Sequence, residues 1–145
     1  MNEEFSVLAT KSTKYLNDAI IVARMAHWNC RGDQYYSAHL MFGRIYDDLA
    51  GIMDPHVELL RACGFNPDFT LFSGPGISMD RYDANSLVEL VLDYVMAANG
   101  SMGMFFRFSE EHSHDPRLVA LGDHLGGASN TLLGDQYLLQ AWLGY

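Results

Sequence analysis

Four long segments repeat apolar residues at intervals of three and four positions, the spacing that predicts amphipathic helices. Across residues 4–29 this stripe contains Leu16, Ile20, Ala23 and His27. Across residues 34–63 it contains Phe42, Tyr46, Leu49, Met53, Val57 and Leu60. A third segment starts near residue 86, with Leu87, Leu90, Val91, Tyr94, Val95 and Ala98, and a fourth covers 116–143. No alternating strand pattern competes, so the sequence predicts an all-α fold.

Residues that start and stop helices support these boundaries. Asp33 is a candidate N-cap for the second segment, and Gly64 is a candidate stop after it. Ser86-Leu-Val-Glu89 has the capping-box pattern, and Asp115-Pro116 pairs an N-cap with a proline in the first turn. Because glycine is a poor helix former, we expect close helix contacts at the four glycines of the last segment, Gly122, Gly126, Gly127 and Gly134.

The connections between the segments define the topology. Two are short, while residues 65–83, rich in proline and glycine, form one long connection with room for a short helix. Four helices of about 25 residues with a single crossover describe a ferritin-like four-helix bundle. The chain has 145 residues, which suits one domain, and we expect 1–145 to form it.

The charged residues of the chain limit the kinds of molecule it can bind. Lys plus Arg total 9 against 18 Asp plus Glu, a net charge of −9, and the only lysines are Lys11 and Lys14. DNA binding depends on neutralising phosphates, so we expect none here; surplus carboxylates favour cations. The acidic N-terminus does not resemble a signal peptide, no apolar run is long enough to span a bilayer, and Cys30 and Cys63 lack metal-site spacing. These features predict a cytoplasmic protein with reduced thiols and no membrane partner.

Two histidines are placed symmetrically about the first short turn. His27 and His39 lie six residues before and after Asp33, and each falls on the apolar stripe of its helix. In an antiparallel helical hairpin, residues equidistant from the turn lie opposite one another. We therefore expect the two imidazoles to meet, and neutral imidazole binds transition metals well. The alternative is a pair of ordinary core histidines.

Two carboxylates lie further along the second helix. Asp54 and Glu58 are four residues apart, so they share one helix face. His39 precedes Asp54 by fifteen residues, roughly 22 Å of helix, too far for both to bind one ion within a chain. A second copy, antiparallel and related by a two-fold axis near residues 46–47, brings His39 of one chain to the carboxylates of the other. The alternative is an ordinary helix ion pair of Glu58 with Arg61.

The set His27-Trp28-Asn29, Gly32, His39, Asp54 and Glu58 resembles the signature of the Dps family, the mini-ferritins named for DNA protection in starved cells. The resemblance is specific over about residues 24–64. It implies a hollow dodecamer that oxidises Fe(II) with hydrogen peroxide or oxygen and stores ferric mineral. It also implies a ferroxidase site at the two-fold interface, with His27 and His39 from one subunit and Asp54 and Glu58 from the other.

Three departures from the family pattern bear on this expectation. The family's usual Asp, four residues after the second His, is Gly43 here; Asp47, one turn on, is a candidate replacement metal ligand. Pro55 removes one backbone hydrogen bond from the helix that carries the carboxylates. The lysine-rich arm of DNA-binding members is missing. The alternative function is therefore a non-catalytic ferritin-like scaffold or assembly protein with a degenerate metal site.

A second group of acidic and histidine residues gathers where the third segment ends and the fourth begins. Its members are Glu110, Glu111, His112, His114, Asp115, Asp123 and His124. Carboxylates are expected at a helix N-terminus because of the helix dipole. The group therefore indicates either solvated helix ends or a path along which cations pass.

Overall fold

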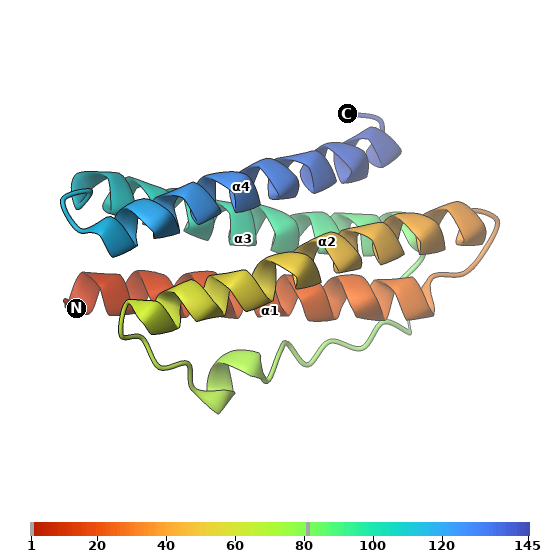
Figure 1. Ribbon diagram of the computed structural model, residues 1–145. Helices are drawn as coiled ribbons and strands as arrows, with labels where there is room; N and C mark the ends of the chain where they lie inside the picture. The colour runs from red at the N-terminus through yellow and green to blue at the C-terminus, as the bar shows by residue number, and fades with distance from the viewer. Residues whose placement is uncertain (1, 81) are drawn as a thin grey trace.

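The computed structural model describes residues 2–80 and 82–145 and shows four long helices (Figure 1). They are α1 (Glu3–Asn29), α2 (Tyr35–Ala62), α3 (Ala84–Glu111) and α4 (Pro116–Leu143), with a short 3-10 helix η1 (Phe69–Phe72) between α2 and α3. Among the described residues there is no strand. The all-α, ferritin-like bundle predicted from the sequence is confirmed, including the short helix in the long connection.

The helices pack as two antiparallel hairpins. α1 pairs with α2 and α3 pairs with α4, while α1 also contacts α3 and α2 also contacts α4. The connection from α2 to α3 returns along the whole bundle outside α1 and α2, so α2 and α3 run in the same direction (Figure 1). η1 packs against α1. Gly74 comes so close to Ile21 of α1 that an added Cβ would lie 2.5 Å from its Cδ1.

The helix boundaries match the predicted ranges to within about two residues, but two predicted caps are wrong. α2 begins after Gln34, which makes no side-chain capping bond, so Asp33 is not its N-cap. α3 begins two residues early because Asp83 caps it, accepting a hydrogen bond from the Ser86 backbone N–H at 2.8 Å. Asp115 caps α4 as predicted, and Gly64 follows α2 with a φ of +92°.

The core lies along the bundle axis, where all four helices contribute buried apolar side chains. On α2 the fully buried stripe is Ala38, Phe42, Ile45, Leu49, Ile52, His56 and Leu60. The predicted stripe was rotated slightly from this line, because Tyr46, Met53 and Val57 are only half-buried. α2 continues unbroken through Pro55. Across 2–80 and 82–145, no helix combines the length and apolar character needed to cross a bilayer.

A buried carboxyl joins α2 to α4. Asp135 is 1% exposed, and its Oδ2 has no hydrogen-bond partner among the described residues. Burial, together with the neighbouring Asp48 carboxyl, raises the pKa of Asp135 to about 8. The protonated acid is therefore the form that the folded protein holds at neutral pH.

We expect Gly122→Ala and Gly134→Ala, both on α4, to change stability in opposite directions. An added Cβ at Gly122 would lie 2.7 Å from the Ser109 Oγ, which is held by a hydrogen bond to Phe106 O. At Gly134 a Cβ meets nothing within 4 Å, so Gly134→Ala serves as the control. Its higher helix propensity should raise the free energy of unfolding by up to about 1 kcal/mol. Urea unfolding measures both; equal gains in the two variants contradict the close contact.

The buried carboxyl of Asp135 predicts that the stability of the folded protein depends on pH. Between the unfolded pKa of 3.8 and the folded value of about 8, only the folded state keeps the Asp135 proton, so stability falls as pH rises through this range. The free energy of unfolding of the wild type should therefore decline from about pH 6.5 to 8 more steeply than that of Asp135→Asn. Parallel pH profiles of the two proteins would show that Asp135 is ionised in the fold.

Candidate metal site at the α1–α2 turn

The last turn of α1 and the first turn of α2 are joined by two histidines. The rings of His27 and His39 stack with centroids 3.8 Å apart and planes 15° apart. His27 Nδ1 lies 2.7 Å from the His39 carbonyl oxygen, and His39 Nδ1 lies 2.8 Å from the His27 carbonyl oxygen. The expected meeting of the two imidazoles is thus present, as a reciprocal pair of side-chain to backbone hydrogen bonds that we call the histidine clasp.

The clasp determines which nitrogen of each imidazole ring has a free lone pair for binding a metal. A carbonyl oxygen only accepts hydrogen bonds, so Nδ1 must carry the proton in both rings. In the neutral ring the lone pair then resides on Nε2, and neither Nε2 has a hydrogen-bond partner among the described residues. Metal-binding histidines commonly donate their other N–H to a carbonyl in this way, because the bond orients the ring and fixes its tautomer.

Gly43 provides the space for the clasp. A Cβ added at this position would lie 2.9 Å from His27 Cε1 and 3.0 Å from His27 Nδ1, closer than real Cβ contacts. The His27 imidazole therefore lies directly on the α2 backbone, where any side chain other than hydrogen displaces it. Glycine at this position is thus a structural requirement of this ring position.

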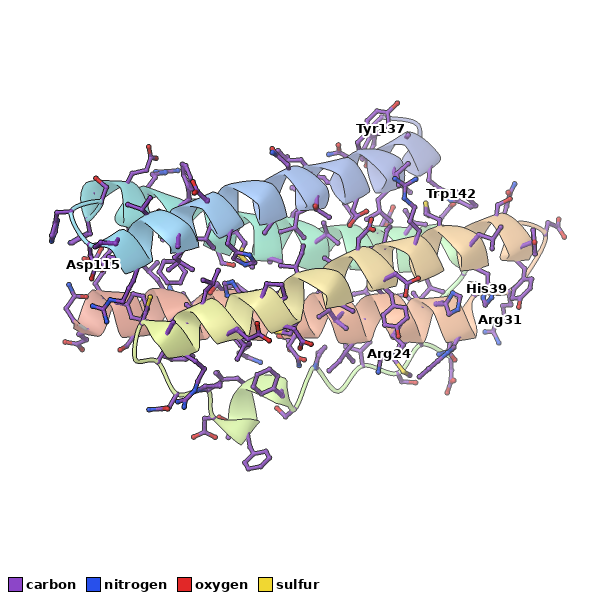
Figure 2. The ribbon with its side chains drawn as sticks, in the orientation of Figure 1. Arg24, Arg31, His39, Asp115, Tyr137 and Trp142 are labelled. Atoms are coloured by element: carbon purple, nitrogen blue, oxygen red, sulfur yellow. The ribbon has the colours of Figure 1, made fainter. Side chains whose placement is uncertain are left out.

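Aromatic and cationic side chains surround the clasp. Tyr35 stacks on the outer side of His39, with ring centroids 5.3 Å apart. Arg24, one turn before His27 on α1, places its guanidinium carbon 4.7 Å from the ring centre of Tyr46 and 5.9 Å from that of Trp28. Figure 2 shows Arg24 and His39 towards the same end of the bundle, far from Asp115. Trp28 nevertheless remains 65% exposed.

The predicted carboxylates lie apart from the clasp within one chain. Asp47, Asp54 and Glu58 are exposed and follow His39 along the same unbroken helix. Asp54 is therefore separated from His39 by roughly 22 Å of helix, as expected. Within the described part of the chain, no three side chains of the metal-binding types His, Cys, Asp and Glu converge. Completing a four-ligand site requires a second copy.

The sequence interpretation overlooked a second histidine pair. His56 is completely buried, and its Nδ1 lies 3.1 Å from the Nε2 of His124 on α4. Burial, with a smaller effect from His124, lowers the pKa of His56 to about 3. His124 was grouped with the helix ends, but its ring turns into the bundle. The signal was available in the sequence, because His56 lies four residues from both Ile52 and Leu60 on the buried stripe.

Neither a protein-family model nor a curated protein matches this chain by sequence. Solved structures do match it. The Dps protein of Thermosynechococcus elongatus superposes with a TM-score of 0.85 at 13% identity, covering 99% of this chain and 92% of that one. A Dps protein from Bacillus brevis superposes with a TM-score of 0.82 at 19% identity, covering 99% of each chain.

A third match is the Dps protein of Vibrio cholerae O1, described as a member of a broad superfamily of ferritin-like diiron-carboxylate proteins. It gives a TM-score of 0.83 at 16% identity, covering 97% of this chain and 89% of that one. Identities this low establish architecture and leave the chemistry of the site to be argued from its own residues. The chain has the ferritin-like four-helix fold of the Dps mini-ferritins.

Proposed function

We propose that this protein is a Dps-like ferroxidase that binds Fe(II) at a site shared between two subunits and stores or detoxifies the oxidised iron in an oligomeric cage. His27 and His39 of one subunit and Asp54 and Glu58 of its partner form the site, with Asp47 as a further candidate ligand. The observation that carries the proposal is the histidine clasp, because its two bonds use Nδ1 of each ring and leave both Nε2 atoms without a hydrogen-bond partner among the described residues.

An apolar surface beside the clasp supports pairing with a second copy. Four large side chains around the α1–α2 turn are more than one-third exposed: Trp28, Tyr35, Tyr36 and Leu40. Contiguous exposed aromatic and aliphatic side chains are typical of protein interfaces. A two-fold axis midway between His39 and Asp54, near residues 46–47, makes two copies of α2 antiparallel and superposes each clasp on the other's carboxylates.

The proposed ligands suit iron oxidation. Imidazole nitrogen accommodates Fe(II), while carboxylate oxygen stabilises the harder Fe(III) more strongly, so oxidation is favoured at a site that combines them. Two Fe(II) ions reduce one hydrogen peroxide, and with two protons the products are two Fe(III) ions and two water molecules. Iron and peroxide are therefore substrates. The exposed Asp47 lies on the same helix, where a carboxylate adds affinity for cations.

The larger assembly follows from the same proposal. We expect two-fold dimers to build a closed cage, a dodecamer as in the resembled family, that works in the cytoplasm without binding DNA. The net charge of −9 supports an affinity for iron over nucleic acid.

A complementation experiment tests the shared site. We expect the double variants His27→Ala/His39→Ala and Asp54→Ala/Glu58→Ala each to lose rapid Fe(II) oxidation, because every site in either homodimer lacks half its ligands. Unfolding and reassembling the two variants together should restore about one quarter of the wild-type rate, since half the dimers are mixed and each contains one complete site. The rate is measured by the absorbance of ferric iron after adding Fe(II) and peroxide.

Each variant reassembled alone is the control. Undiminished oxidation by either double variant contradicts the site itself. If both double variants lose Fe(II) oxidation and mixing them does not restore it, the site is not shared between two subunits. A protein that assembles but never oxidises Fe(II), even as wild type, is the non-catalytic scaffold.

Gly43 offers a second test, because the family pattern and the geometry give opposite expectations. Restoring the family's usual carboxylate with Gly43→Asp should weaken Fe(II) binding by about tenfold or more, because the new Cβ displaces the His27 ring. Gly51→Ala is the matched control on the same helix, where a Cβ meets nothing within 4 Å. Calorimetric titration measures the affinity, and the imidazole NMR signals of the metal-free protein report the clasp. Tighter binding in Gly43→Asp contradicts this role for the glycine.

A further inference from the structure

The fully buried His56 of α2 and the half-buried His124 of α4 form a polar chain that extends into the bundle interior. Ser12 of α1 contacts His56 Nε2 at 2.9 Å, and His56 Nδ1 contacts His124 Nε2 at 3.1 Å. The two imidazole centroids are 5.3 Å apart. His56 and Ser12 are both fully buried. Three helices therefore contribute to a hydrogen-bonded chain in which two ring nitrogens face each other.

Hydrogen-bond directions identify the lone pair on His56. Ser12 Oγ also lies 3.2 Å from the Ala9 carbonyl oxygen, which can only accept. Both contacts of Ser12 are hydrogen bonds only when its O–H donates to Ala9 and its oxygen accepts from His56 Nε2–H. The Nδ1 of His56 then carries a lone pair directed at His124. Ser12 thus holds His56 as an outer-shell partner holds a metal-binding histidine.

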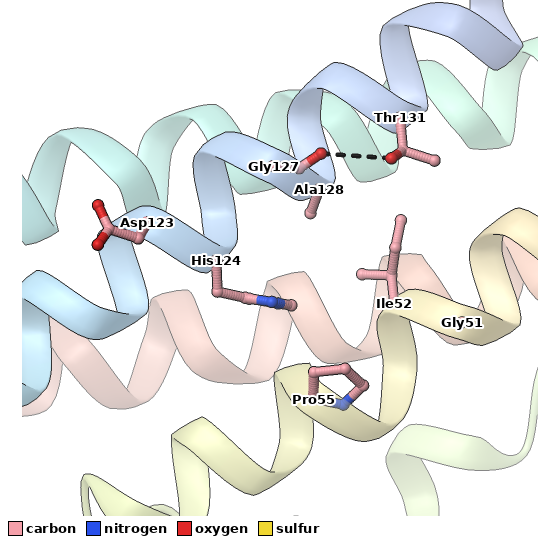
Figure 3. Close-up of a pocket in the computed structure, with 8 residues that line it drawn as sticks. All are labelled: Gly51, Ile52, Pro55, Asp123, His124, Gly127, Ala128 and Thr131. Atoms are coloured by element: carbon pink, nitrogen blue, oxygen red, sulfur yellow. Dashed lines mark hydrogen bonds between the residues drawn. The ribbon is translucent and has the colours of Figure 1, made fainter.

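A surface pocket reaches the His124 ring of this pair. The pocket has a volume of about 260 Å³ and is lined by His124 together with Pro55, Asp123 and Thr131. Figure 3 shows the His124 ring reaching from α4 into the space between the two helices, towards Pro55 of α2. His124 is part of the pocket wall and the fully buried His56 is not, so an ion that enters the pocket reaches His56 Nδ1 when the His124 ring turns towards the pocket.

We propose that His56 Nδ1 and His124 Nε2 bind a divalent transition ion of the borderline class, such as Zn(II) or Co(II), between α2 and α4. Imidazole nitrogen suits such ions, and water in the pocket completes the coordination. Two nitrogens at about 2.0–2.1 Å from a tetrahedral ion lie about 3.3 Å apart, close to the separation in the bundle. Each ring must then rotate, because lone pairs that face each other along the line between the nitrogens have to converge on the ion at about the tetrahedral angle.

Binding at this pair needs no net proton release. His124 moves its ring proton from Nε2 to Nδ1 through pocket water, and His56 keeps its proton on Nε2 towards Ser12. The hydrogen bonds place one proton on each ring, because His56 donates Nε2–H to Ser12 and its Nδ1 accepts from the Nε2–H of His124. Neutral imidazole is the form that binds metal.

This site is distinct from the clasp and independent of the proposed ferroxidase function. His56 follows His39 by roughly 26 Å along α2. Its ring points into the core, whereas Asp54 and Glu58 on either side of it in sequence are exposed. A substitution at the clasp therefore leaves the buried pair intact, which allows the two sites to be measured separately.

The test titrates Co(II), and then Zn(II), into the assembled His27→Ala/His39→Ala protein, in which the clasp is absent. We expect one bound ion per chain by calorimetry, with the visible absorption of Co(II) bound by nitrogen, and a higher melting temperature with Zn(II). Adding His124→Gln should weaken binding by about tenfold or more and remove the absorption. Adding His114→Gln, at an exposed ring, should change neither.

Ser12→Ala provides a second measurement, because it keeps both imidazoles and removes the hydroxyl that bonds His56 Nε2 and the Ala9 carbonyl. We expect a weaker affinity for Co(II) with the stoichiometry of one ion per chain retained. Circular dichroism of the metal-free proteins verifies that each variant is folded. The proposal is overturned if the clasp-free protein binds no Co(II) or Zn(II), or if binding is the same with and without His124; the pair then shares only a proton.

Discussion

The arrangement of this protein's candidate site depends on the reciprocal bonds between His27 and His39 and each other's carbonyl oxygens. These bonds join the end of α1 to the start of α2, and the bond from His39 satisfies the His27 carbonyl in the last turn of α1. They also fix the proton of each ring on Nδ1, so that the reactive lone pair is on Nε2. One interaction therefore joins the two helices and orients the two proposed metal ligands, because the imidazole has two chemically distinct nitrogens.

The clasp explains why glycine at position 43 is compatible with a metal site. From the family pattern alone, the missing carboxylate suggests a decayed site. The geometry gives a different reason, since the His27 ring occupies the space that a side chain at Gly43 would need. In the proposed site the cost is one fewer anionic ligand, so carboxylates from a partner subunit would be more important for holding Fe(III).

The two faces of α2 lie in different environments. Its outer face exposes Asp47, Asp54 and Glu58, which can meet another subunit, while its inner face buries His56 against α1 and α4. The helical repeat separates these roles, because residues two apart point in nearly opposite directions. The same helix can therefore contribute to a site between subunits and to a separate one inside the bundle.

The amino-acid sequence by itself determined the four helices, the single crossover and the mirror placement of His27 and His39, because apolar periodicity and turn residues are local signals. It also indicated that His39 and Asp54 cannot share an ion within one chain, since helical rise sets their separation. Only the tertiary structure decided the contact of Gly43 with His27 and the pairing of His56 with His124. These contacts depend on how closely two helices approach and on the rotation of each about its axis, which periodicity defines only coarsely: the predicted stripe of α2 passed through Met53 and Val57, whereas the buried line passes through Ile52 and His56.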